Sequence, residues 1–410
     1  MMLTSLALVF LCGILLSSLF QKLKIPGLMG MLITGIVLGP YALNLLDGSL
    51  LGISAELRQI ALIIILMRAG LNLDIRDLKK VGRPAILMCF VPACFEIAGM
   101  VLIAPKLLGI SMLDAAIMGA VVSAVSPAVI VPKMLHLMED RYGTGQSIPQ
   151  LIMAGASVDD VFVIVLFTAF TGLAQGESIS PVRFVQIPVS IVLGLIVGIG
   201  LGLALAWFFQ KYHIRDSVKV VILLSAAFLL VALEAALKGS VPVSGLLAVM
   251  SMVAALQKRK GDVAKRLSCK FSKLWIAAEI LLFVLVGATV DIQYAASAGL
   301  TAVLAVVGAL LFRILGVFCC LLKTKLLMKE RLFCMIAYLP KATVQAAIGS
   351  IPMALGLPCG KIVLTVAVLA ILITAPLGAF GVDMTYKWLL QREAGQSIDS
   401  AMEQNSIEKG

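Results

Sequence analysis

The chain has 410 residues, of which 61% are hydrophobic and 13% are charged, and its formal net charge at pH 7 is +11. So few charged residues cannot cover a soluble globule of this size, which excludes a water-soluble protein. The long apolar runs do not alternate between apolar and polar residues, which excludes a membrane β-barrel. We therefore predict an all-α polytopic membrane protein.

Apolar stretches long enough to cross a bilayer, at roughly 20 residues each, recur along the chain. The first has no basic segment before it and no cleavage site of small residues, so we expect a membrane helix and not a removed signal peptide. Together the stretches predict about thirteen transmembrane helices, near 3–20, 27–45, 56–73, 83–108, 112–138, 148–174, 182–209, 216–238, 240–256, 270–290, 294–322, 330–356 and 361–390.

The basic residues orient these helices. If the N-terminus lies outside the cell, most Lys and Arg fall in inner loops, as the positive-inside rule requires. We therefore predict a cell-membrane protein with a cytoplasmic C-terminus. The strongest basic run, 258–273, is explained by attraction to anionic lipid, and no nucleic-acid motif accompanies it, so we expect a lipid partner and no nucleic acid.

The eight cysteines and two histidines do not predict a metal or cofactor site. The cysteines lie mostly inside apolar runs without a Cys-x-x-Cys pair, and His136 and His213 are isolated. We expect the cysteines to be small buried hydrophobic residues, and we expect no cofactor.

Matching landmarks indicate an internal duplication. The third and tenth helices both end in Gly-x-x-x-Asp, at Asp74 and Asp291, an offset of 291 − 74 = 217 residues. The same offset connects Glu96, the lone acid of the fourth helix, with Arg313, the lone base of the eleventh. Seven helices separate the copies, and an odd number inverts the second copy in the membrane. We therefore predict a first repeat over 1–174, a linker helix over 175–215, a second, inverted repeat over 216–390 and a disordered cytoplasmic tail over 391–410.

One helix of each repeat is interrupted by proline. Pro127 follows Ser126 in the fifth helix, and Pro340 precedes Thr343 in the twelfth, close to the position that the offset predicts. Proline removes a backbone donor and disfavours helix at the residue before it. A single kinked helix is common, but two matched breaks are typical of transporters that bind their substrate at the membrane midplane.

Asp159 and Asp160 are adjacent in the apolar stretch 148–174, where a carboxylate is costly and is rarely without function. Consecutive helical residues point about 100° apart, so we expect one aspartate to face an ion and the other to brace a neighbour or line the entrance. A proton and a hard monovalent cation compete for the same oxygens, which gives exchange if the site faces one side at a time. The alternative is a structural salt-bridged pair, but this helix has no base nearby.

Further charged residues lie within the predicted helices. Glu96 and Arg313 stand at equivalent depth in the two repeats, and we interpret them as an ion pair that holds the halves in register, with a direct role in transport as the alternative. We expect the ammonium of Lys341, at the second break, to offset the negative end of a half-helix. Arg68 lies near a helix end and Glu279 lies mid-helix, and the sequence assigns no role to either.

These residues resemble the cation/proton antiporter superfamily, in particular its sodium(lithium)/proton exchangers with paired aspartates. The likeness extends over nearly all of the membrane portion. It is carried by Ala124-Val125-Ser126-Pro127-Ala128-Val129, Asp159-Asp160 and Pro340-Lys341-Ala342-Thr343-Val344-Gln345-Ala346.

The resemblance implies a transporter, not an enzyme, with the sodium/proton antiporter fold and two crossed discontinuous helices. It implies a homodimer whose core domain, drawn from helices 3–6 and 10–13, moves like an elevator. It also implies that Asp160 binds sodium or lithium ions and protons, with Asp159 and Ser126 beside it.

Electrogenic relatives usually have a lysine where this chain has Arg313. Because arginine is effectively never deprotonated, it releases no proton during exchange. We therefore expect electroneutral exchange of one cation per proton. Electrogenic exchange of sodium or potassium for protons stays an alternative, since carboxylate, hydroxyl and carbonyl oxygens serve all three alkali ions.

Two other classes of protein also use acids inside the membrane. An intramembrane aspartyl protease needs two carboxyl groups that converge from separate helices, whereas Asp159 and Asp160 diverge from one. A cation channel needs a ring of acids around a pore, and only one helix here carries such acids.

Overall fold

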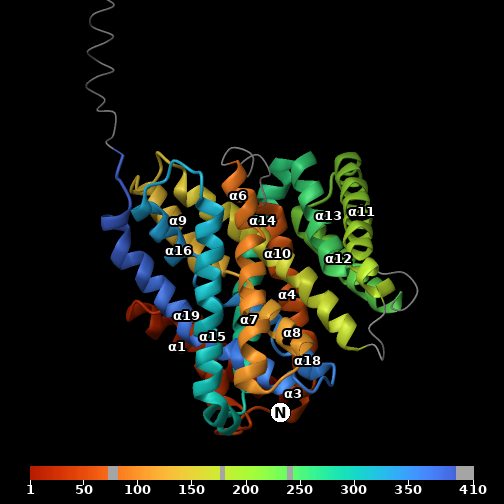
Figure 1. The fold of residues 1–410 in the computed structure, drawn as a ribbon. Helices are drawn as coiled ribbons and strands as arrows, with labels where there is room; N and C mark the ends of the chain where they lie inside the picture. The colour runs from red at the N-terminus through yellow and green to blue at the C-terminus, as the bar shows by residue number, and fades with distance from the viewer. Residues whose placement is uncertain (73–81, 176–180, 238–242, 394–410) are drawn as a thin grey trace, which may run out of the picture.

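The computed structural model describes residues 1–72, 82–175, 181–237 and 243–393, and nearly all of them are helical. Among these residues the only isolated β-bridge joins Tyr142 and Arg392. The helices run side by side between two ends of the molecule, with the N-terminus at one end and the last described residues, near 393, at the other (Figure 1). The prediction of an all-α membrane protein is confirmed, while Asp74, one landmark of the predicted repeat, lies outside the described residues.

Within the described ranges, nine helical segments are long and apolar enough to cross a membrane. They comprise α1 (Met2–Lys22), α6 (Arg83–Met88) with α7 (Val91–Leu108), α8 (Met112–Ser123) with α9 (Pro127–Glu139), α10 (Ile148–Ala174), α11 (Pro181–Lys211), α12 (Asp216–Ala236), α14 (Gly261–Ala288), α15 (Ile292–Leu321) and α19 (Gly360–Leu389).

The other predicted stretches contain helices that are shorter or more polar. These are α2 (Gly27–Leu38), α4 (Ser54–Asn72), α13 (Gly245–Arg259), α16 (Met328–Ala337), α17 (Thr343–Ile348) and α18 (Ile351–Ala354), and a short helix α3 (Gly48–Gly52) precedes α4. The count of thirteen spans is therefore confirmed only in part. Broken and short helices fall below the length that a continuous span requires.

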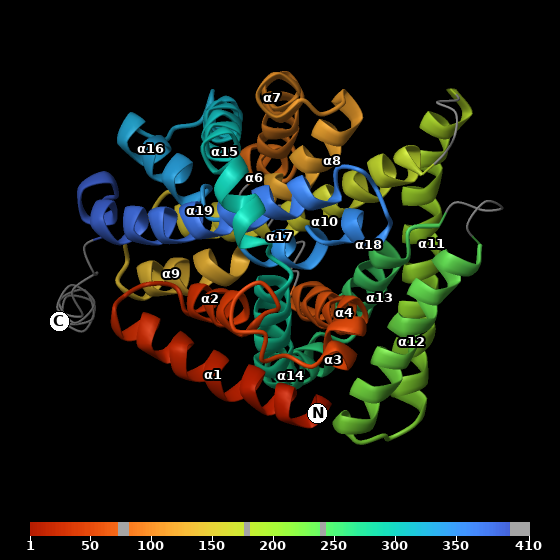
Figure 2. The same cartoon turned by 90° about the horizontal axis from the view of Figure 1, so that it is seen from below.

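The helices form two groups that Figure 2 shows from one end. In one group α1 packs on α2, α2 on α14, α13 on α4, and α12 on α13; in the other, α7 packs on α15, α8 on α10, and α16 on α19. The pairs α1–α2 and α2–α14 are mirrored by α12–α13 and α13–α4, which is the pattern that an inverted repeat predicts.

This grouping corrects one expectation drawn from the resemblance. The third and tenth predicted helices, α4 and α14, were expected in the core with the broken helices. They pack instead on each other and on α13 and α2, and they make fewer contacts with α17. The group that holds the broken helices thus consists of α6–α10 and α15–α19.

In that group, α7 and α15 approach each other closely because glycines lie between them. A Cβ atom at Gly316 would lie 2.8 Å from Pro92 Cα, and one at Gly99 would lie 2.6 Å from Phe312 Cδ2, so neither position has room for a side chain. The close approach brings Glu96 of α7 and Arg313 of α15 within contact distance.

Candidate functional site

Both predicted helix breaks are present, and they cross. Residues 124–126 separate α8 from α9, and residues 338–342 separate α16 from α17. The backbone N–H of Ser126 donates to the carbonyl oxygen of Pro340 at 2.8 Å. Pro127 occupies the first turn of α9, where a missing N–H costs no intrahelical bond. Two helix C-termini and two helix N-termini therefore meet in the middle of one group of helices.

Arg313 contacts the C-terminal ends of both first half-helices. Its Nε donates to the carbonyl oxygen of Tyr338 at 2.7 Å, and its Nη1 donates to the carbonyl oxygen of Ser123. These carbonyls terminate α16 and α8, where the helix dipoles are negative. The sequence favoured Lys341 for this contact, whereas the structure shows the ammonium of Lys341 bound to Glu96.

Five ionisable side chains, none more than 8% exposed, surround the crossing: Glu96, Asp159, Asp160, Arg313 and Lys341. Glu96 Oε2 accepts from Arg313 Nη1 at 2.9 Å and from Lys341 Nζ at 2.6 Å. Its carboxylate therefore joins the two bases of the cluster.

The two adjacent aspartates have different surroundings. Asp159 Oδ2 accepts from Arg313 Nη2 at 2.9 Å and from the backbone N–H of Val125 at 2.9 Å. Asp160 has no ion-pair partner among the described residues. Asp159 thus fixes α10 to the first break, while the Asp160 carboxylate stays available to a substrate ion.

Five buried side-chain oxygen atoms lack a hydrogen-bond partner within the described part of the chain. One, Gln150 Oε1, lies near the start of α10, and the other four are Ser126 Oγ, Asp159 Oδ1, Asp160 Oδ1 and Thr343 Oγ1. A buried polar group left unpaired costs about 1–3 kcal/mol. Ser126 lies in the first break, which the bond between Val125 and Asp159 connects to α10, and Thr343 begins α17 directly after the second break. Carboxylate and hydroxyl oxygens are hard donors, the type that small alkali cations bind, so this set of residues fits such an ion as a substrate.

Gln345 connects the two breaks, a role that the sequence did not reveal. Its Nε2 donates to the carbonyl oxygens of Val122 at 3.3 Å and Ala124 at 2.9 Å, and its Oε1 accepts from the N–H of Ala342 at 2.8 Å. The only sequence signal for Gln345 was its place in the run that begins at Pro340.

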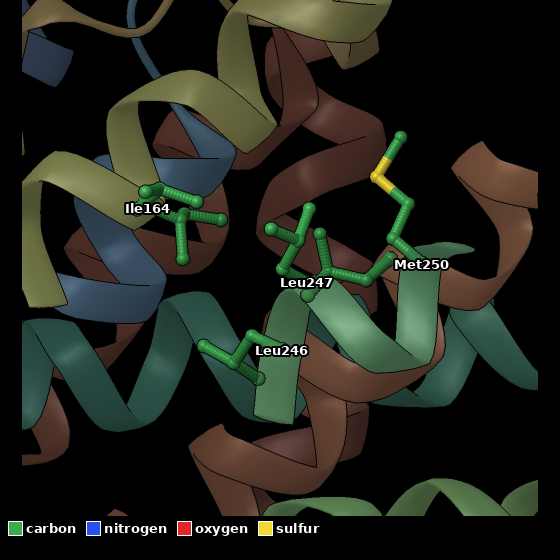
Figure 3. Close-up of a pocket in the computed structure, with 6 residues that line it drawn as sticks. Ile164, Leu246, Leu247 and Met250 are labelled. Carbon is green, nitrogen blue, oxygen red and sulfur yellow. The ribbon is translucent and has the colours of Figure 1, made fainter. Parts of the chain in front are cut away.

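A separate pocket lies between α4, α10 and α13 (Figure 3). It is lined by Leu66, Ile164, Val165, Leu246, Leu247 and Met250. These side chains offer no oxygen to a cation, so this pocket is not an ion site. Within the described ranges there is also no group of three or more His, Cys, Asp or Glu residues that fits a metal ion.

A buried charge cluster at two crossed half-helix breaks defines a secondary transporter of the alternating-access class. Two solved structures of the sodium proton antiporter MjNhaP1 from Methanocaldococcus jannaschii have the same fold. One has a TM-score of 0.84 and 22% identity and covers 94% of this chain and 98% of that chain. The other has a TM-score of 0.75 and 21% identity, with coverage of 96% and 99%.

Sequence comparisons then establish the family. The family model described as sodium/hydrogen exchanger, transmembrane, matches residues 6–388. Sodium/hydrogen exchanger 9B2 of Homo sapiens is 34% identical over 420 residues, which cover 96% of this chain and 76% of that protein. Sodium/hydrogen exchanger 9B1 of Homo sapiens is 33% identical over 350 residues, 80% of this chain and 65% of that protein. The chain therefore belongs to the sodium/hydrogen exchanger family, whose members are transporters and not enzymes.

Proposed function

We propose that this protein exchanges sodium or lithium ions for protons, with Asp160 as the residue that takes up either ion. The observation that carries the proposal is the contrast between the aspartates: Asp159 is held by Arg313 and Val125, and Asp160 has no ion-pair partner among the described residues. The unpaired oxygens of Ser126 and Thr343 supply neutral ligands at the same crossing.

Exchange follows from competition for Asp160. A carboxylate that binds a proton has no charge left for a cation, and one that binds a cation repels the proton. A bare carboxylate is costly inside a membrane protein, so the group that carries the site moves only when one of the two ions neutralises it. The site then faces each side in turn, and each crossing carries one ion.

The charges of the cluster support electroneutral exchange. Glu96, Asp159 and Asp160 contribute three negative charges and Arg313 and Lys341 two positive ones, so the ionised cluster carries 2 − 3 = −1. One sodium ion or one proton brings this sum to zero. Electrogenic exchange has one observation in its favour, because Lys341 is a titratable amine 2.6 Å from Glu96 and a buried lysine can release its proton.

The test is a proteoliposome assay that follows an imposed pH gradient after addition of sodium, lithium or potassium. We expect sodium and lithium to dissipate the gradient, with an apparent KM that rises as the pH falls, and we expect Asp160→Asn to abolish the response. Asp383→Asn, which removes a half-exposed carboxylate of α19, is the matched control and keeps it. Sodium-driven proton movement at an undiminished rate in Asp160→Asn contradicts the proposal.

Stoichiometry is measured on the same vesicles with the membrane potential clamped by potassium and valinomycin. Electroneutral exchange predicts rates that do not depend on the potential and no transport current. A current whose sign reverses with the sodium gradient establishes the electrogenic alternative.

We also propose how the protein is assembled and oriented in the membrane. We propose a homodimer in the cell membrane with the N-terminus outside, repeats over 1–174 and 216–390, the linker helix over 175–215, and an elevator movement of the group that contains the breaks. The beginning of α14, which contains most of the basic run, lies at the same end of the molecule as the end of α19, and the N-terminus lies at the other (Figure 1). Exposed apolar side chains on α1 and α12, such as Leu11 and Leu229, suit lipid or a second copy.

A further inference from the structure

The two chain breaks are anchored in the same way, each by one side chain of the helix that follows its broken helix. In the first repeat, the N–H of Val125 donates to Asp159 Oδ2 of α10 at 2.9 Å. In the second, the N–H of Lys341 donates to Thr374 Oγ1 of α19 at 2.9 Å. The donors lie 341 − 125 = 216 positions apart and the acceptors 374 − 159 = 215, within two residues of the repeat offset. Thr374 is therefore the counterpart of Asp159.

The bond between Lys341 and Thr374 lies in a fully buried part of the molecule. Thr374 is 1% exposed, and Lys341 is equally buried, so water does not replace the bond. One turn later, α19 passes directly against the break, because a Cβ atom at Gly378 would overlap the ring of Pro340. Thr374 and Gly378 thus form one face of α19 on which Pro340 and Lys341 rest.

The position of this break decides the position of three groups at the site. Pro340 accepts from the N–H of Ser126, the Lys341 ammonium binds Glu96, and Thr343 begins α17 with an unpaired hydroxyl. A threonine in this place holds the backbone without adding charge. A carboxylate there, as in the first repeat, would add a fourth negative charge to the cluster.

We propose that Thr374 is a positioning residue for ion exchange, which holds the second break so that Lys341 and Thr343 keep their places at the site. The inference depends on the proposed function of that site. Thr374 touches neither sodium nor proton, and acts through the backbone of Lys341.

The test compares Thr374→Val, which keeps the shape and removes the acceptor, with Thr374→Ser, which keeps the hydroxyl. Thr365→Val is the matched control in the same helix, because the buried Thr365 hydroxyl donates only to Lys361 of its own helix, at 2.9 Å. Apparent KM for sodium, maximal rate and the pH profile are measured in proteoliposomes. The melting temperature in detergent is measured alongside.

We expect Thr374→Val to raise the apparent KM for sodium about tenfold, the factor that corresponds to about 1.4 kcal/mol and lies within the range for an orphaned buried group. Its pH profile shifts as well, while Thr374→Ser and Thr365→Val stay near the wild type. Unchanged KM and pH profile in Thr374→Val, or equal damage in Thr374→Ser, overturns the inference. If Thr374→Val does not fold, Thr374→Ala against Thr374→Ser gives the same comparison.

The two proposals fail in different ways. If Asp160→Asn still exchanges ions, the proposed function is wrong whatever Thr374 does. If Asp160→Asn is inactive and Thr374→Val matches the wild type, only the role of Thr374 is wrong.

Discussion

Arg313 and Glu96 lie 217 positions apart in the sequence and 2.9 Å apart in the structure. The same guanidinium also binds Asp159 and the ends of α8 and α16. One fully buried side chain therefore connects α7, both broken helices and the helix with the paired aspartates. Because four hydrogen bonds from its five N–H donors end on acceptors of opposite charge or dipole, the cluster is held together although it is buried.

Glu96→Gln tests the strength of this connection. The substitution leaves Arg313 and Lys341 buried without their shared carboxylate, and breaking a buried ion pair costs about 3–5 kcal/mol. We expect a clear loss of thermal stability in detergent. Asp383→Asn is the control. The Asp383 side chain is 51% exposed, so its ion pair with Lys133 contributes at most about 1 kcal/mol to stability. Equal melting temperatures for the two variants would show that the Glu96 pairs do not stabilise the fold.

Gly155→Ala tests the packing under Asp159. Gly155 lies one turn before Asp159 in α10, and a Cβ atom there would overlap the hydroxyl of Tyr338, whose carbonyl accepts from Arg313. We expect an overpacking cost of about 1–3 kcal/mol in melting experiments and slower exchange in proteoliposomes. Gly172→Ala in the same helix is the control, since no atom lies within 4 Å of its added Cβ.

The double variant Gly155→Ala with Tyr338→Phe identifies the obstacle. Removing the hydroxyl relieves the overlap, but Met88 Cβ at 3.0 Å still lies close, so we expect partial recovery of stability. If stability does not recover at all, the Tyr338 hydroxyl is not the group that excludes a side chain at Gly155.

The sequence predicted the parts of this site that depend on backbone chemistry. Pro127 and Pro340 break their helices because proline removes a donor, and a buried carboxylate pair such as Asp159 and Asp160 is too costly to be incidental. An offset of charged residues predicted that Glu96 and Arg313 belong to corresponding helices.

The remaining features depend on how the helices cross, which periodicity does not determine. Whether Arg313 or Lys341 reaches the carbonyl ends depends on the close approach of α7 and α15, and which aspartate is braced depends on the rotation of α10. Gln345, with three hydrogen bonds, and Thr374, with one, act on backbone groups in and beside irregular segments, for which no spacing rule exists. The assignment of α4 and α14 was wrong for a similar reason, since an apolar helix does not indicate which neighbour it packs against.

Gln345→Leu tests whether the two breaks must be connected to each other. The change leaves the N–H of Ala342 and the carbonyls of Val122 and Ala124 without their partner, and each orphaned group costs about 1–3 kcal/mol. We expect a large loss of maximal exchange rate together with a lower melting temperature. Gln293→Leu, at an exposed position of α15, should change neither. A variant Gln345→Leu with the wild-type rate would show that the breaks keep their geometry independently.

Truncation after Glu393 and truncation after Leu389 separate two parts of the C-terminal segment. Gly143 donates to the carbonyl of Gln391 at 2.8 Å and Glu393 donates to the carbonyl of Arg141 at 2.9 Å, so residues 391–393 are tied to the loop that joins α9 to α10.

Removing 394–410, the part of the predicted disordered tail 391–410 that lies outside the described residues, should leave melting temperature and exchange unchanged. Removing 390–410 also breaks those two bonds and the bond from Thr144 Oγ1 to Glu393 at 2.8 Å, and at about 0.5–1.5 kcal/mol each we expect a loss of about 2–4 kcal/mol in stability. The released loop joins α9, which follows the first break, to α10, which carries Asp160. We therefore expect exchange to slow as well. Identical rates and melting temperatures for both truncations would show that this contact supports neither the fold nor the site.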